Sequence, residues 1–411
     1  MTDKNNKNQT AGHITLHYSI AFAVFFAAFC MIRSFISVYL LDRGFSYTQV
    51  GVITGIHMFV AAAIQPNYSF ILDRLKLSLH RFITLCCIPA VLCSLLTFLL
   101  PANMLIFIPL YILFGLCEIG LQSLMVSIGM EYVNAGVPVN AGVGRGAGSV
   151  GYGIANLGLG YLIVKYGSPI SQKLNIVLML ALAFLIITLP DPEKLKTEDA
   201  LESEKDEAPA DDLFHFLRNN HVFALFSLSV ICIFFAHSIV NTYMPNVAGQ
   251  FGLASDFTGL LNSIAAFLEL IPMMFYSQIS KRISPFKLLY ISAVFFTVKI
   301  LTATLATNAA GLVISQAMQI LAYALFAMAS IYFTNQAVRP HNRVMAQGLL
   351  VGANEIGFTI GSLVGGIVLD HTTVKTLLWM GVIVSVIGST LMITAISKFR
   401  KNETGPFRLR S

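Results

Sequence analysis

The stretch PDPEKLKTEDALESEKDEAPADD, residues 190–212, divides an otherwise apolar chain into two parts. The sequence has 411 residues, of which 56% are hydrophobic and 11% are charged, yet half of its 20 acidic residues lie in this stretch. Soluble domains are about a quarter charged, so the composition of the remainder excludes an ordinary soluble fold. The stretch itself has few apolar residues with which to build a core and is typical of a solvated linker.

Long apolar segments flank this linker on both sides. A hydrocarbon core about 30 Å thick requires roughly 20 apolar residues in a helix. Six segments before the linker and six after it meet or approach that length: 18–41, 47–72, 82–100, 104–130, 146–164, 174–189, 222–245, 257–279, 288–307, 309–338, 344–369 and 376–397. We therefore predict an all-α membrane protein with twelve transmembrane helices.

The position of the linker predicts that these spans form two pseudo-symmetric six-helix bundles, residues 18–189 and residues 222–397. Outside the bundles we expect an N-terminal tail (1–17), the acidic linker (190–221) and a basic C-terminal tail (398–411). The two halves also share a weak pattern. Arg33 precedes Tyr39 by six residues, as His237 precedes Tyr243. Internal repeats of this kind are typical of transporters.

The distribution of Lys and Arg predicts the orientation of the chain, because positive loops stay on the cytoplasmic side. Twenty of the 26 basic residues fall in the tails and in the loops that share a side with the linker. The opposite loops hold only Arg43, Lys165, Lys173 and Lys375. We expect a multi-pass protein of the cell membrane with both termini in the cytoplasm.

Other sequence features argue against alternative classes. All six cysteines fall in apolar segments without metal-ligand spacing, so we expect neither disulfides nor a metal site. No P-loop, HExxH or G-x-S-x-G motif is present, so we expect no enzyme, no catalytic residues and no cofactor. We also expect no nucleic-acid partner, and a monomer in the lipid bilayer.

Ionisable residues inside the predicted spans are the candidate functional residues. Each costs about 2.5–3.5 kcal/mol at the centre of a span, so it should face a partner or a wet cavity. They are Arg33, His57, Glu118, His237, Glu269, Lys299 and Glu355, with Glu131 and Arg145 nearer the ends of spans 4 and 5. Glu269 and Glu355 lie near midspan and are candidates for binding substrate or carrying a proton, although a structural ion pair is the alternative.

The remaining ionisable residues are candidates as well, and three of them have two interpretations. The guanidinium of Arg33 suits direct substrate contact because it offers five donors in a fixed fork. Lys299 is the expected partner of one of the glutamates. His57 and His237 are either core histidines or site residues, and Glu118 is either a site carboxyl or a hydrogen-bonded packing residue.

These features together resemble the major facilitator superfamily, and within it the branch of lactose permease and the oligosaccharide and phenylpropionate proton symporters. Asp73 and Arg74 stand where the superfamily has its acidic-basic loop motif, which acts in conformational change. The segment RGAGSVGY at 145–152 is similar to the permease segment that contacts sugar, which implies substrate-binding roles for Arg145 and Tyr152. Glu269 matches the acidic substrate-binding position of the branch.

The resemblance also bears on proton coupling. Lys299 stands where the permease has an arginine that is important for coupling. The sequence departs from the branch on span 10, where Met318 and Leu321 replace a histidine and a glutamate and no charged residue is present. The coupling residues are expected among Glu269, Lys299 and Glu355, with His237 as a further candidate, and transport without proton coupling is the alternative.

The sequence thus predicts a secondary transporter that moves a small polar, sugar-like solute by alternating access. We expect it to be a symporter driven by a proton gradient. Arg33, Arg145, Tyr152, Glu269 and His237 are its predicted substrate-binding residues. An exporter of amphipathic compounds or an organic-anion carrier is the alternative within transport, favoured by the cationic residues. A membrane receptor that does not transport is a further alternative.

Overall fold

A computed structural model describes residues 2–64, 68–135, 137, 139, 141–190, 213–338 and 343–404. Twelve helical segments in the described ranges are long and apolar enough to cross a membrane, which confirms the predicted all-α fold with twelve spans. Most of the predicted linker, residues 191–212, lies outside the described residues, as do Pro66 and the end of the C-terminal tail. The predicted domain limits stay a prediction.

The first six spans are formed by nine α-helices and one π-helix. They are α1 (Thr2–Arg33), α2 (Ile36–Asp42), α3 (Tyr47–Ile64), α4 (Tyr68–Leu75), α5 (Leu79–Leu99), α6 (Met104–Phe114), the π-helix η2 (Gly115–Ile119), α7 (Leu121–Asn134), α8 (Ala141–Tyr166) and α9 (Ile170–Thr188). The first helix therefore begins inside the predicted N-terminal tail. Span 4 is composed of α6, η2 and α7, so its helix is interrupted near its middle.

The last six spans follow the described end of the linker. Their helices are α10 (Leu213–Asn219), α11 (His221–Gly249), α12 (Ser255–Met274), α13 (Tyr276–Arg282), α14 (Pro285–Leu305), α15 (Ala309–Ala317), the 3-10 helix η5 (Met318–Ile320), α16 (Tyr323–Ala337), α17 (Arg343–His371) and α18 (Val374–Thr404). The short helix α10 occupies the end of the predicted linker because Phe216 is buried against the ring of Phe223 at 5.5 Å.

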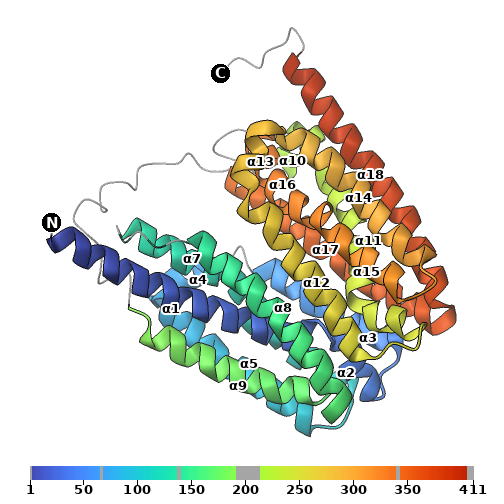
Figure 1. Ribbon diagram of the computed structural model, residues 1–411, viewed down its shortest axis with the longest axis horizontal. Coiled ribbons are helices and arrows are strands. Elements are labelled where there is room, and N and C mark those ends of the chain that lie inside the picture. Colours follow the sequence, from blue (N-terminus) through green and yellow to red (C-terminus); the bar gives the residue numbers. More distant parts are fainter. Residues whose placement is uncertain are drawn as a thin grey trace. The chain divides into compact units, whose positions relative to one another are not determined.

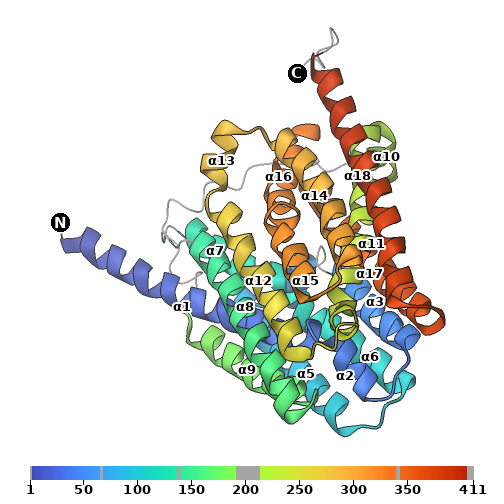
Figure 2. The same ribbon diagram turned by 45° about the vertical axis from the view of Figure 1, so that its right-hand side comes forward.

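The chain forms two compact units. The first contains residues 1–206 and 254–267, and the second contains residues 207–253 and 268–411. Inside the first unit, α1 packs along α8 and α5 packs along α9 (Figure 1). Inside the second, α11 packs along α17 and α18, and α14 packs along α18, as Figure 2 shows. Spans 1 and 5 thus pair as spans 7 and 11 do, and spans 3 and 6 as spans 9 and 12 do.

Close helix packing in both units depends on small residues. A Cβ atom added at Gly151 of α8 would lie 2.5 Å from the backbone oxygen of Ala23 on α1. The corresponding contact in the second unit places Gly361 of α17 against Phe235 of α11, with 2.4 Å from such a Cβ to the backbone oxygen. Small residues let two membrane helices approach closely. At this separation neither position has room for a side chain.

Helix α11 is kinked where its backbone leaves helical geometry. Tyr243 has φ −109° and ψ 16°, and Pro245 follows two residues later. Proline lacks an N–H and its ring clashes with the preceding turn, which accounts for the kink. The Tyr243 hydroxyl donates to the backbone oxygen of Ser362 at 2.6 Å, which fastens the kinked segment to α17.

Candidate functional site

A buried hydrogen-bonded chain joins two of the predicted site residues inside the second unit. The Lys299 ammonium donates to Oε1 of Gln319, and Nε2 of Gln319 donates to Oε1 of Glu269 at 2.5 Å. Lys299 is only 2% exposed and Gln319 only 4%, whereas Glu269 is half-buried. The amide of one glutamine therefore connects a cation with a carboxylate in the interior of a membrane-spanning bundle.

Three elements position this chain. Lys299 lies on α14 and Glu269 on α12, while Gln319 belongs to η5, the 3-10 turn that interrupts span 10. The Ser315 hydroxyl donates to the backbone oxygen of Lys299 at 2.7 Å. Ser292 donates in the same way to the backbone oxygen of Ala322 at 2.6 Å, an oxygen that also accepts from the backbone N–H of Phe326 at 3.2 Å.

His237 lies beside this chain, enclosed by aromatic rings. Its imidazole stacks on the Tyr323 ring with centroids 5.8 Å apart and an interplanar angle of 8°. Phe296 and Phe358 present their ring edges to it at 5.5 and 5.7 Å. A cavity of about 10 Å³ is lined by both His237 and Lys299, a volume that suits one water molecule.

Glu355, the second candidate proton carrier, is half-buried on α17. It precedes Phe358 by three residues, and Phe358 contacts the ring of His237. Residues three apart on a helix share a face, so Glu355 lies on the side of α17 that carries Phe358.

The predicted residues of the first unit gather at the end of α1. The Tyr152 hydroxyl on α8 lies 2.9 Å from that of Ser34, the residue after Arg33. The Phe29 ring is 5.2 Å from the Arg33 guanidinium carbon and 6.4 Å from the Tyr152 ring. Arg33 and Tyr152 therefore belong to one cluster, which the sequence predicted only as separate candidates.

Arg145 lies on α8 seven residues before Tyr152 and is exposed. Seven residues are nearly two helical turns, or about 10 Å along the axis, so the two side chains share a face at different depths. The expectation that Arg145, Tyr152 and Glu269 form one substrate site stays a prediction. Arg74, at the end of α4, is exposed, and the side chain of Asp73 lies outside the described residues.

Glu118 belongs to a separate buried network within the first unit. It lies on the π-helix η2 and its Oε1 accepts from Nδ2 of Asn175 at 3.0 Å. The same Asn175 nitrogen donates to the backbone oxygen of Ala28 at 3.1 Å, and its Oδ1 accepts from Ser94 at 2.7 Å. Glu118 is 1% exposed. The Asn175 amide on span 6 thus connects spans 1, 3 and 4, whereas Oε2 of Glu118 has no hydrogen-bond partner among the described residues.

His57 is fully buried on α3, where its ring meets the edge of Tyr111 at 5.6 Å. Within the described part of the chain, neither ring nitrogen has a hydrogen-bond partner. No group of three His, Cys, Asp or Glu side chains among the described residues is arranged to hold a metal ion.

Sequence reasoning missed Gln319 and Asn175, the two amides that connect the charged residues. Neither side chain is ionisable, and span 10 contains no charged residue that would point to Gln319. Amides in apolar spans are a usable signal, because an unpaired amide in hydrocarbon is costly and should therefore mark a polar partner nearby.

Comparisons with known proteins agree with this architecture. A model of the MFS_1 like family matches residues 15–394. The fold is similar to crystal structures of the nucleoside transporter NupG, with a TM-score of 0.78, 17% identity, and coverage of 93% of this chain and 98% of that one. A point mutant of NupG gives a TM-score of 0.79 with 15% identity, over 93% of this chain and 99% of the other.

A third similar structure is a bacterial homologue of the human lysosomal transporter Spinster, in an inward-facing and unoccupied conformation. Its TM-score is 0.68 with 14% identity, and the match covers 97% of this chain and 99% of that one. No curated protein matches the sequence. Since the family match extends over nearly all twelve spans, the chain belongs to the major facilitator superfamily and is a membrane transporter.

Proposed function

We propose that this transporter carries a small polar solute together with protons across the cell membrane by alternating access. The observation that supports the proposal best is the buried chain from Lys299 through Gln319 to Glu269. Ionisable residues inside membrane spans are costly and usually belong to substrate or ion pathways. Three polar side chains from three different spans form a group that one solute or one proton can rearrange.

Glu269 is the proposed proton carrier because it occupies the end of the chain that is half-buried rather than enclosed. When its carboxylate takes up a proton, the negative charge facing the Gln319 amide disappears. Lys299 then loses its counter-charge at the other end of the same amide. Protonation therefore changes the hydrogen bonding of three helices at once, and Glu355 is the second candidate for this role.

The proposed substrate is a neutral solute with several hydroxyl groups, such as a sugar. A carboxylate accepts hydrogen bonds from hydroxyl groups, so Glu269 suits such a ligand. Arg33 is a separate candidate, because a guanidinium donates to hydroxyl oxygens. A nucleoside is the second candidate, because its ribose offers the same hydroxyls and two of the similar structures are of a nucleoside transporter. An organic anion is the alternative favoured by the cationic residues.

We further propose that both termini and the linker are cytoplasmic and that the monomer is the working unit. The excess of Lys and Arg on the linker side supports the orientation.

The experiment begins with the purified full chain and a thermal-shift screen against sugars, nucleosides and aromatic acids. A ligand that binds only the folded state raises its apparent stability, by about 2.7 kcal/mol at one hundred times its Kd. The best ligand is then tested in proteoliposomes for uptake with and without a pH gradient. We expect accumulation only with the gradient. Uptake that ignores pH would exclude symport and leave facilitated diffusion or another coupling ion.

A further inference from the structure

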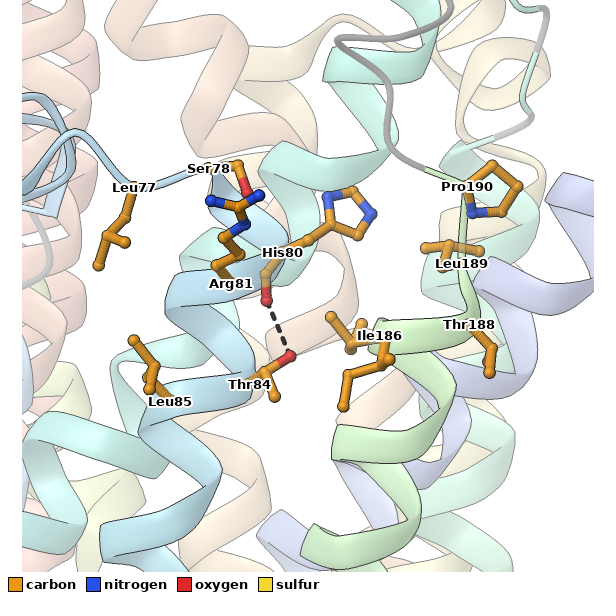
Figure 3. A pocket seen from close by; sticks show the side chains of 11 residues that line it. Leu77, Ser78, His80, Arg81, Thr84, Leu85, Ile186, Thr188, Leu189 and Pro190 are labelled. Atoms are coloured by element: carbon orange, nitrogen blue, oxygen red, sulfur yellow. Dashed lines mark hydrogen bonds between the residues drawn. The ribbon is translucent and has the colours of Figure 1, made fainter.

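A groove in the first unit lies between the start of α5 and the end of α9. It has a volume of about 740 Å³, and its lining comes from residues 77–85 on one side and 186–190 on the other. Figure 3 shows Ser78 and Arg81 at one end of the groove and Leu85 and Ile186 farther along it. The lining contains none of the residues proposed to bind substrate or protons, so the groove is considered as a site of its own.

The end of the groove nearest the loop is polar and positively charged. Arg81 is exposed there, and the Ser78 hydroxyl has no hydrogen-bond partner among the described residues. Ser78 also precedes the first turn of α5, whose leading N–H groups have no partner within the helix. The groove lining that the structure describes contains no Asp or Glu. This end is therefore suited to an anion.

Two other hydroxyls at the groove are already engaged. Thr84 donates to the backbone oxygen of His80 at 2.9 Å, and Thr188 donates to that of Phe184 at 2.9 Å. The exposed donor at this end is the guanidinium of Arg81, whose N–H groups match the oxygens of one phosphate group, while His80 and the buried Ser78 hydroxyl lie beside it.

The opposite end of the groove is apolar and faces outward. Leu85 is 49% exposed and Ile187 is 67% exposed, while Ile186 forms the buried wall between them. Helix α5 has 21 residues and is about 31 Å long, so its first turn lies at the boundary of the hydrocarbon core. The polar end of the groove is thus at headgroup level, and the apolar end is at the level of acyl chains.

We propose that this groove binds one anionic phospholipid of the leaflet on the linker side. Its phosphate is held by Arg81 at the polar end, and an acyl chain runs along Leu85 and Ile187. The separation of the lining into a cationic end and an apolar end selects a phospholipid over a soluble anion, which would leave the apolar end uncovered. Clustered positive charge at the membrane surface favours anionic headgroups, and exposed Arg74 and Lys76 add to it.

The test uses the purified, delipidated full chain in detergent and measures lipid binding by native mass spectrometry. Phosphatidylglycerol and phosphatidylcholine with identical acyl chains are titrated separately, with inorganic phosphate as a third ligand. We expect saturable binding of one phosphatidylglycerol at concentrations where phosphatidylcholine binds at least about tenfold more weakly, the scale of one charge-assisted hydrogen bond.

Arg81→Gln should abolish this preference, whereas Arg81→Lys should retain it because the charge remains. Arg218→Gln is the matched control, since it removes an exposed arginine from α10 in the second unit. Each variant is compared with its own binding of phosphatidylcholine, so a loss of stability does not mimic a loss of preference. Equal binding of the two lipids, an equal effect of Arg218→Gln, or binding of inorganic phosphate that displaces the lipid would each overturn the proposal.

Discussion

Lys299 and Glu269 do not need to touch each other to be coupled, because both bond to the side-chain amide of Gln319. The amide presents its oxygen to the ammonium and its nitrogen to the carboxylate. Each charge is thereby solvated by one end of the same dipole. A change in the charge of Glu269 therefore alters the electrostatic environment of Lys299 through an amide that carries no net charge.

Glu269→Gln is expected to abolish accumulation driven by a pH gradient while protein abundance stays near that of the wild type. The variant keeps the shape of the side chain, and its carbonyl oxygen can still accept from Gln319. It loses the group that binds a proton. Uptake and solute exchange in proteoliposomes, measured beside abundance, check this. Wild-type accumulation with unchanged pH dependence would remove Glu269 from the coupling site, and Glu355→Gln would be the next variant.

Gln319→Leu is expected to reduce pH-driven uptake strongly and to lower the free energy of unfolding by about 1–3 kcal/mol, because two buried polar partners lose their hydrogen bonds. Gln316→Leu is the control. The Gln316 amide is equally buried, but its contact is with the sulfur of Met244 at 3.9 Å, and a thioether is a weak acceptor. Equal effects of the two substitutions would show that the Gln319 bridge has no special role.

Glu118→Gln is expected to leave transport and its pH profile close to wild type, since a glutamine oxygen can still accept from Asn175. Asn175→Leu should instead destabilise the first unit by about 1–3 kcal/mol, because Ser94, Ala28 and Glu118 all lose a partner. Thermal unfolding in detergent and proteoliposome uptake distinguish the two. Loss of pH-driven uptake in a normally abundant Glu118→Gln protein would place a proton-binding group in this network.

Alanine substitutions of two glycines on α8 are expected to differ in their effect on stability. Gly151→Ala introduces a Cβ atom 2.5 Å from a backbone oxygen, which should cost about 1–3 kcal/mol by overpacking. Gly158→Ala meets nothing within 4 Å and should be neutral or stabilising by up to about 1 kcal/mol through helix propensity. The melting temperatures of the purified variants provide the comparison, and a drop of equal size at both positions would contradict the packing argument.

A reporter that is active only in the cytoplasm should work when it is fused after Ser411 or inserted near Glu204, because the positive charge of the chain is concentrated on that side. A matched insertion in the loop at residues 167–169, just after Lys165 and the end of α8, should be inactive. Activity in this loop with silence at the other two positions, in well-expressed fusions, would reverse the proposed orientation.

Hydropathy was sufficient to predict the spans because a membrane helix must satisfy its own backbone and present apolar side chains to lipid. It failed where polar residues are buried against each other. Helix α9 begins at Ile170, earlier than predicted, because Gln172 is buried and accepts from Thr97 at 3.2 Å. A polar residue with a hidden partner looks like a loop residue when the sequence is read alone.

The candidate site was predictable in part for the same reason. Charge inside an apolar span is visible in the sequence, so Lys299 and Glu269 were found. The amide between them carries no charge, and its position depends on the interruption of span 10, which no local pattern revealed. The pairing of Arg33 with Tyr152 likewise required the packing of α1 on α8.

Spans 4 and 10 are each divided by an interruption into two helical arms. A continuous helix that tilts at one membrane face must swing in the opposite direction at the other. A helix with a π-turn at Glu118, or a 3-10 turn at Gln319, can bend at that joint, so one arm can move while the other stays packed. We expect the hydrogen bonds that Glu118 and Gln319 make to limit how far each span bends at its interruption.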